Sequence, residues 1–145
     1  MQSISENESM LDEGVLLEAA REAREKAYAP YSRFLVGAAI LDDQGKLYKG
    51  CNVENAAYPQ GTCAEAGAIA AMILAEGRQI RAIAVVGESP DPVTPCGGCR
   101  QKIREFAGST TPILIGDLKQ LRLRLTLAEL LPHSFGPEYL LQEPK

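Results

Sequence analysis

Apolar and polar residues follow one another along the chain in patterns that predict helices alternating with strands. Residues 10–27 place apolar side chains every three or four positions with charged residues between them, which predicts an amphipathic helix that ends before Pro30. Residues 34–41 and 46–53 are β-like and flank a turn at residues 42–45, so they predict a hairpin. The first half of the chain therefore predicts one helix followed by two antiparallel strands.

The second half of the chain predicts two more helices and three more strands. Thr62 is a suitable N-cap for an alanine-rich helix, and Pro95 precedes a second helix at about residues 96–106. Between and after these helices lie short apolar segments of strand length, at residues 80–87, 112–115 and 121–127. The remaining residues, 130–141, contain two prolines and a glycine and predict an irregular tail with a short helix.

The order of these elements predicts the α/β class. Helices that alternate with strands favour a mixed sheet with helices on both faces, that is, a three-layer α/β/α sandwich with five strands. The 145 residues suit one domain, because they are too few for two of ordinary size. We expect a flexible N-terminus at residues 1–9 and a single domain at residues 10–145.

Composition and charge narrow the classes of partner. Apolar residues make up 46% of the chain and charged residues 23%, which is the balance of a globular protein with a real core. The net charge of −4 argues against sequence-independent binding of a nucleic acid polymer, which needs a basic face. No apolar run approaches the roughly 20 residues of a membrane span, and the first residues do not resemble a secretory signal. We therefore expect a cytoplasmic protein without a membrane partner.

Two short motifs carry the most specific chemistry. Cys63 lies two positions before Glu65, at the start of the alanine-rich helix that follows Thr62. Cys96 and Cys99 lie at the start of the helix predicted at about residues 96–106. The free N–H groups and the positive dipole end of a helix N-terminus favour the thiolate form of cysteine. Three thiolates supply three ligands of a tetrahedral zinc site, and an open fourth position is typical of a catalytic zinc. Glu65 is close enough to such a site to move protons without being a ligand.

Other interpretations of these residues stay open. Cys51 has a suitable side chain for a fourth ligand, but it lies within a predicted strand without ligand spacing, so we expect an ordinary buried cysteine. The other three cysteines could be buried thiols, or Cys96 and Cys99 could form a redox pair, although a redox pair would leave Cys63 and Glu65 unexplained. Glu65 could itself be a first-turn acid that complements the helix dipole.

The two motifs resemble those of the zinc-dependent nucleobase deaminases, in which His/Cys-x-Glu is followed by Pro-Cys-x-x-Cys. Further similarity lies in residues 31–39, 52–58, 100–101 and 130–137, so the resemblance covers about residues 10–141. Together these segments are similar to the small homotetrameric cytidine deaminases. The resemblance implies one zinc ion per subunit, and hydrolytic deamination of cytidine and 2′-deoxycytidine to the corresponding uridines, with release of ammonia, in pyrimidine salvage.

The resemblance also implies a role for each residue of the site. Cys63, Cys96 and Cys99 would bind zinc, while Glu65 would carry protons from water to ring N3 and to the departing amine. Further residues would contact the substrate: the backbone N–H of Ala64 at the base O2, the carbonyl of Thr94 at the leaving ammonia, Asn52 and Glu54 at the ribose 3′-hydroxyl, and Phe34 against the nucleoside. Phe135 would enter the site of a neighbouring subunit, so that the homotetramer shares its active sites.

Some of these roles have simpler alternatives. Asn52 and Glu54 could cap a loop at the end of a strand, and Phe34 and Phe135 could be core aromatics. The single histidine, His133, lies in the proline-flanked tail far from both motifs, and we expect no catalytic role for it.

Two further features of the sequence concern arginine residues, one on a predicted edge strand and one at the site. Arg122 and Arg124 alternate with leucines, which predicts an edge strand with a solvated basic face. Family members with three cysteine ligands often carry Arg directly after the Glu, where it donates to the thiolates, but this chain has Ala66. The two helix dipoles or Arg100 could take over that role.

The sequence also allows two alternative functions. One is deamination of another cytosine nucleoside, such as blasticidin S. The other is a non-catalytic, zinc-stabilised oligomer that binds nucleosides, although the presence of Glu65 beside a three-ligand site argues against it.

Overall fold

Five strands form one mixed sheet in the computed structural model, which describes residues 6–141. The strands are β1 (Val36–Asp42), β2 (Leu47–Cys51), β3 (Ile80–Gly87), β4 (Pro112–Gly116) and β5 (Leu121–Thr126). Their order across the sheet is β2-β1-β3-β4-β5. β1 is antiparallel to both β2 and β3, β3 is parallel to β4, and β4 is antiparallel to β5. The predicted mixed five-stranded sheet is confirmed.

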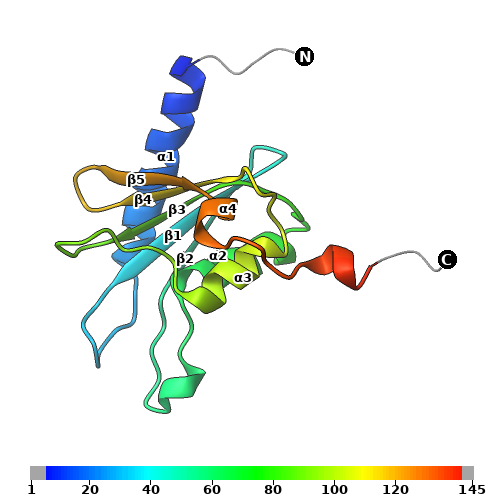
Figure 1. The fold of residues 1–145 in the computed structure, drawn as a ribbon. Helices are drawn as coiled ribbons and strands as arrows, with labels where there is room; N and C mark the ends of the chain where they lie inside the picture. The colour runs from blue at the N-terminus through cyan, green and yellow to red at the C-terminus, as the bar shows by residue number, and fades with distance from the viewer. Residues whose placement is uncertain (1–5, 142–145) are drawn as a thin grey trace.

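Helices cover both faces of this sheet (Figure 1). α1 (Glu6–Arg24) lies against one face, and α2 (Ala64–Leu74), α3 (Gly97–Arg104) and the short α4 (Leu127–Leu130) lie against the other. Along β3, Ala84 and Val86 pack with α1, whereas Ile83 and Val85 pack with the opposite helices. Because both faces are covered, β3 is apolar without alternation. The architecture is the predicted three-layer α/β/α sandwich.

Two elements end earlier than their sequence pattern predicts, because their flanking residues pair with each other. α1 ends at Arg24 and β2 ends at Cys51. Beyond these ends, Tyr28 and Val53 form a parallel bridge, and Val53 also forms an antiparallel bridge with Thr62. Residues 54–61 form an arm that projects from the body of the molecule (Figure 1). The two bridges hold the segment after α1 beside the base of this arm.

The starts of two helices also differ from prediction. The N-cap of α2 is Cys63 rather than Thr62, because the backbone of Thr62 is held in the bridge to Val53. α1 begins at Glu6, so residues 6–9 of the segment expected to be flexible are helical, whereas residues 1–5 lie outside the described part of the chain.

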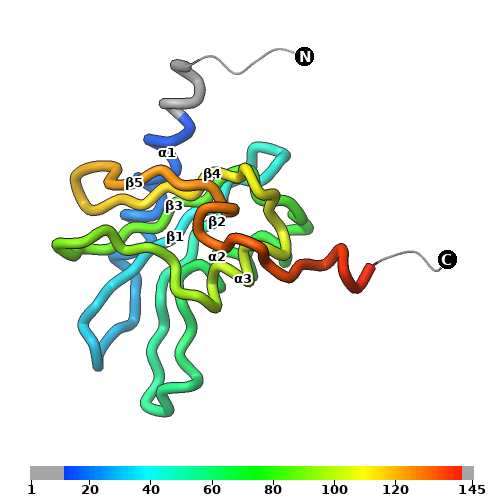
Figure 2. The backbone as a smooth tube through the Cα atoms, in the orientation of Figure 1, coloured from blue at the N-terminus to red at the C-terminus, as the bar shows by residue number. Residues whose placement is uncertain are grey.

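α4 was not predicted, although its signal is present in the sequence. Thr126 and Glu129 form a capping box at its start, in which each side chain bonds the backbone of the other. After α4 the tail crosses α3 and extends away from the body to the 3-10 turn η2 (Pro137–Tyr139), as Figure 2 shows. None of the helices within residues 6–141 combines the length and apolar character that crossing a membrane requires.

Candidate active site

The three motif cysteines meet where two helices begin. Cys63 is the N-cap of α2, Cys96 is the N-cap of α3, and Cys99 is the third residue of α3. The Cys63 side chain makes no capping bond to its own helix, so its sulfur atom is available to a ligand. The three Sγ atoms lie within 4.8 Å of one another, and the Sγ atoms of Cys63 and Cys96 are 3.8 Å apart.

These separations suit a zinc ion. Two sulfur ligands about 2.3 Å from a tetrahedral zinc lie roughly 3.8 Å apart, which is the separation of Cys63 and Cys96. Thiolate ligands also favour zinc, whereas magnesium and calcium bind oxygen ligands. Cys51 is not part of this cluster; it is half-buried and lines a different cavity beside the end of α1.

The electrostatic surroundings of the three thiols differ. A hydrogen bond from the backbone N–H of Cys99 lowers the pKa of Cys96, as expected for a thiol at a helix N-terminus. Burial raises the pKa of Cys99, and it also raises the pKa of Cys63. Two of the thiols therefore need a cation to become thiolates, and binding of a metal releases protons here.

Glu65 lies in the first turn of α2 and is 3% exposed. Burial raises the pKa of its carboxyl group, against the opposing effect of hydrogen bonds from its own backbone and from Cys99. Burial is one of the ways in which enzymes raise the pKa of a carboxyl group that transfers protons. Glu65 is therefore placed for proton transfer, because it lies beside the thiols and away from bulk water.

A cleft of about 300 Å³ opens above these residues. Eight of the residues predicted from the sequence line it: Phe34, Asn52, Glu54, Cys63, Ala64, Glu65, Thr94 and Cys96. The volume is at the lower end of the range for small-molecule sites. The chain therefore brings a three-sulfur metal site, a buried acid and polar groups together around one small-molecule cleft.

Comparison with known proteins identifies the family. The family model for the cytidine and deoxycytidylate deaminase zinc-binding region matches residues 10–115. The chain belongs to this deaminase family. The cytidine deaminase of Sporosarcina psychrophila is 43% identical over 130 residues, which cover 90% of this chain and 96% of the relative. The cytidine deaminase of Mycobacterium tuberculosis is 40% identical over 133 residues, covering 92% and 96%.

Solved structures agree with the sequence comparison. The crystal structure of cytidine deaminase from Burkholderia pseudomallei matches with a TM-score of 0.79 at 45% identity, covering 84% of this chain and 98% of that one. The structure from Mycobacterium tuberculosis matches with a TM-score of 0.73 at 41% identity, covering 86% and 98%. The predicted family, fold, zinc cofactor and hydrolytic deaminase class are confirmed.

Asn52 and Glu54 hold together the loop that forms one wall of the deaminase cleft. Asn52 accepts from the backbone N–H of Val36 at 2.9 Å and donates to the carbonyl of Phe34 at 2.8 Å. Glu54 accepts from the backbone N–H groups of Tyr31 and Ser32, at 3.0 and 3.1 Å, and from the Ser32 hydroxyl. These bonds, led by the one from the Ser32 hydroxyl, lower the pKa of Glu54.

Each of these two side chains keeps unused bonding capacity. The Asn52 amide has a second N–H, and the Glu54 carboxylate has a lone pair in addition to those that accept its three hydrogen bonds. A loop-capping role and a substrate-binding role are therefore compatible at both positions.

Four residues line the cleft that the sequence did not single out as site residues: Ser32, Val36, Val85 and Val93. Ser32 lies within the segment that resembles the family, but only the folded structure shows its bond to Glu54. The three valines carry no distinctive sequence signal, because buried valines occur throughout α/β sheets. They give the cleft its apolar walls.

Arg100 anchors the loop in front of the cysteines. Its guanidinium group donates to the carbonyl of Pro95 at 2.7 Å, to the carbonyl of Leu130 at 2.9 Å and to the hydroxyl of Thr94 at 3.1 Å. These bonds engage all three of its nitrogen atoms with partners other than the thiols. This engagement of Arg100 favours the helix N-termini among the two proposed substitutes for an arginine at Ala66, in keeping with the lowered pKa of Cys96 at the start of α3.

Phe135 does not line the cleft of its own chain. Its ring is 56% exposed and stacks on Tyr139, with 5.0 Å between the ring centroids. The alternative of a core aromatic is therefore wrong for this residue within one chain. His133 is exposed, with a φ of 51°, at the turn into the tail.

Proposed function

We propose that this protein catalyses the hydrolytic deamination of cytidine and 2′-deoxycytidine to uridine and 2′-deoxyuridine in pyrimidine salvage in the cytoplasm. The observation that carries the proposal is the position of Glu65, a buried acid that lines a nucleoside-sized cleft together with Cys63 and Cys96. In the reaction a C4–O bond forms, the C4–N bond breaks, and ammonia leaves. The catalytic domain comprises residues 10–145.

Cys63, Cys96 and Cys99 would hold the zinc ion, which would lower the pKa of a water molecule and so supply the nucleophile at neutral pH. Glu65 accepts a proton from water, donates a proton to ring N3 and delivers one to the departing amine. Its burial supports this role, because a desolvated carboxyl group exchanges protons only with groups inside the cleft.

The base is oriented by backbone groups. The N–H of Ala64 binds the base O2, and the carbonyl of Thr94 accepts a hydrogen bond from the leaving ammonia. Ala64 is the first residue of α2, so its N–H has no partner within the helix and is free for a ligand. Phe34 lines the cleft with 40% of its surface exposed, which leaves its ring free to pack on the nucleoside.

The sugar is bound by Asn52 and Glu54 through its 3′-hydroxyl. A hydroxyl group both donates and accepts. The free N–H of Asn52 and the free lone pair of Glu54 match these two needs. Because both contacts are made to the 3′-hydroxyl, the 2′-hydroxyl is not required, and both cytidine and 2′-deoxycytidine are substrates.

The enzyme works as a homotetramer with shared active sites. Exposed apolar side chains in the tail support this assembly, since Phe135, Tyr139, Leu140 and Leu141 are each more than half exposed. Phe135 then enters the cleft of a neighbouring subunit.

Ultraviolet absorbance of cytidine incubated with the zinc-loaded protein tests the function, with Glu65→Gln as the matched control. We expect the wild type to convert cytidine and 2′-deoxycytidine, and the variant to keep one zinc per chain while losing turnover by at least about a hundredfold. Conversion of blasticidin S but not of cytidine would indicate a different substrate. Nucleoside binding without conversion would indicate a non-catalytic protein.

A further inference from the structure

The loop between β3 and α3, residues 88–96, carries part of the cleft without regular secondary structure of its own. Val93 and Thr94 line the cleft, and Cys96 is one of the three sulfur residues. The position of this loop therefore sets both the wall that faces the base and one metal ligand. Contacts from outside the loop must fix it.

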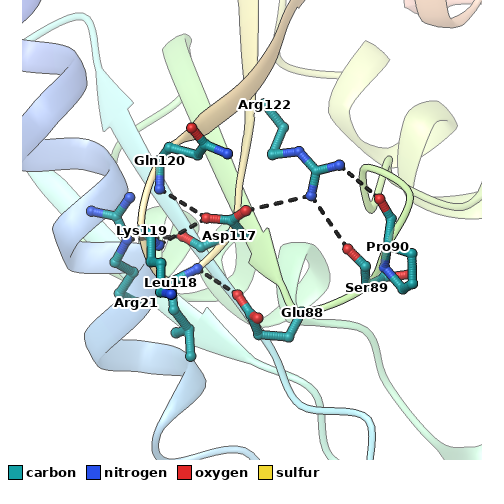
Figure 3. Close-up of polar contacts among 9 residues, drawn as sticks. All are labelled: Arg21, Glu88, Ser89, Pro90, Asp117, Leu118, Lys119, Gln120 and Arg122. Atoms are coloured by element: carbon teal, nitrogen blue, oxygen red, sulfur yellow. Dashed lines mark hydrogen bonds and ion pairs between the residues drawn. The ribbon is translucent and has the colours of Figure 1, made fainter.

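One such contact comes from β5, on the far side of the sheet's β4 strand. The guanidinium group of Arg122 donates to the carbonyl of Pro90 at 2.8 Å and to the carbonyl of Ser89 at 3.3 Å (Figure 3). The same group pairs with the carboxylate of Asp117 at 3.4 Å. The side chain of Arg122 is only 23% exposed, so the predicted solvated basic face is wrong for this residue.

Asp117, the ion-pair partner of Arg122, is itself held in place. Asp117 accepts from the backbone N–H groups of Lys119 and Gln120, both at 2.8 Å, and these bonds lower the pKa of its carboxyl group. The backbone carbonyl of Asp117 accepts a hydrogen bond from the side chain of Arg21 in α1, at 3.0 Å. A second link joins the same turn to the loop, since Glu88 accepts from the N–H of Leu118 at 2.7 Å (Figure 3).

The anchored residues are connected to the cleft by a short, stiff segment. Only Asp91 and Pro92 separate Pro90 from Val93, and the two prolines restrict the backbone on either side of Asp91. Val93 packs against the end of β3, where a Cβ at Gly87 would lie 3.1 Å from its side chain. A displacement at Pro90 is therefore passed on to Val93.

We propose that Arg122 is a positioning residue that fixes the β3–α3 loop so that Val93 and Thr94 form the wall of the substrate cleft. This inference rests on the proposed function. It assigns Arg122 a role in nucleoside binding without contact to the nucleoside.

Arg124 provides a matched control. It lies two positions further along the same strand. It forms an ion pair with Glu13 of α1, with distances of 2.8 and 2.6 Å, and makes no contact with the loop among the hydrogen bonds of the described residues. Both substitutions to alanine remove an arginine and one ion pair, but only Arg122→Ala releases the loop.

The experiment measures KM and kcat for cytidine, the Kd for uridine by calorimetry, and zinc content in wild type, Arg122→Ala and Arg124→Ala. We expect Arg122→Ala to raise KM and Kd about tenfold while zinc stays at one per chain. This is less than the hundredfold loss that a displacement of about 1 Å can cause at a reacting group. Arg124→Ala should change neither constant. Arg122→Lys, which keeps the charge near Asp117 but loses the forked geometry, should lie between the two.

Equal KM and Kd values in Arg122→Ala and Arg124→Ala would overturn the inference. A fall in kcat and zinc content with KM and Kd unchanged would also overturn it, since that pattern indicates a structural role alone. If Arg122→Ala does not fold, the comparison of Arg122→Lys with Arg124→Lys decides in the same way. A wild type that binds uridine but does not deaminate cytidine would refute the proposed function, and the Kd comparison would still test the anchor.

Discussion

Gly50→Ala tests how closely α2 must approach the sheet for the site to form. Gly50 lies in β2 opposite the first turns of α2, and a Cβ built on it would lie within 2.8 Å of backbone atoms of Ala64, Gly67 and Ala68. An ordinary Cβ contact is at least 3.4 Å, so even the most distant of these atoms must move by about 0.6 Å. Because all three atoms belong to the helix backbone, the whole start of α2 must withdraw from β2.

The consequences for the site follow from what this helix carries. The start of α2 holds Cys63 and Glu65, whereas Cys96 and Cys99 are held by a different helix, α3. A displacement approaching 1 Å can lower the rate of a positioned reaction by about a hundredfold. Overpacking of this kind also costs about 1–3 kcal/mol of folding free energy. We expect Gly50→Ala to lower kcat/KM for cytidine by about ten- to a hundredfold and to weaken zinc binding.

Gly67→Ala is the matched control, because Gly67 faces Gly50 across the same contact. A Cβ at Gly67 would lie 3.5 Å from the nearest atom, which is an ordinary contact. Alanine is favoured over glycine within a helix by about 1 kcal/mol, so this variant should keep its activity and gain a few degrees in Tm. The assays are steady-state kinetics by absorbance, zinc content and thermal unfolding. Unchanged kcat/KM and Tm in Gly50→Ala, or equal losses in both variants, would refute the reasoning.

Four further substitutions, one of them a control, test other parts of the molecule. Phe135→Ala should raise KM for cytidine severalfold while the chain stays folded, since a stacked aromatic contributes about 1 kcal/mol and the residue is exposed within one chain; unchanged kinetics would remove it from the shared site. Cys99→Ser should lower zinc content while Cys51→Ser leaves it at one per chain, and the reverse result in metal analysis would contradict the ligand assignment. Asp42→Asn should destabilise the fold by about 1–2 kcal/mol at neutral pH. Burial opposes ionisation of Asp42, but its bonds from the backbone N–H groups of Lys46 and Gln44 and from the Tyr48 hydroxyl lower its pKa below the usual value. Its stabilising effect is therefore present above the ordinary carboxyl pKa and is lost as pH falls through the lowered one, so urea titrations should show the two proteins converging at acidic pH.

The local parts of this structure could be predicted from the sequence. The apolar periodicity of each segment indicates its type, and the alternation of segments indicates the sheet with helices on both faces. The cluster of Cys63, Cys96 and Cys99 could also be predicted, because each motif lies at the start of one helix and depends on short spacings along the chain.

The parts that escaped prediction depend on contacts between distant segments. The early end of α1 follows from the bridge between Tyr28 and Val53, and the extended backbone of Thr62 follows from its pairing with Val53. Neither pairing leaves a pattern in either segment alone. Arg122 resembles any basic residue on an edge strand until its partners at Ser89 and Pro90, more than thirty positions away, are known.

The topology explains why distant contacts are needed at this site. α2 leads into β3 and α3 follows it, so both helices begin at the end of the sheet where β3 finishes, and Val85 near that end lines the cleft with Cys63 and Thr94. Two helix N-termini can bring their own cysteines to this point, because α2 packs on β1 and β2 and α3 packs beside α2. The chain between β3 and α3 has no regular secondary structure, so it depends on contacts from other elements. Arginines from α3 and β5 hold its two ends instead, through Thr94 and Pro95 on one side and Ser89 and Pro90 on the other. The chemistry of the site is thus local to two motifs, while the geometry of its cleft depends on residues that touch neither zinc nor nucleoside.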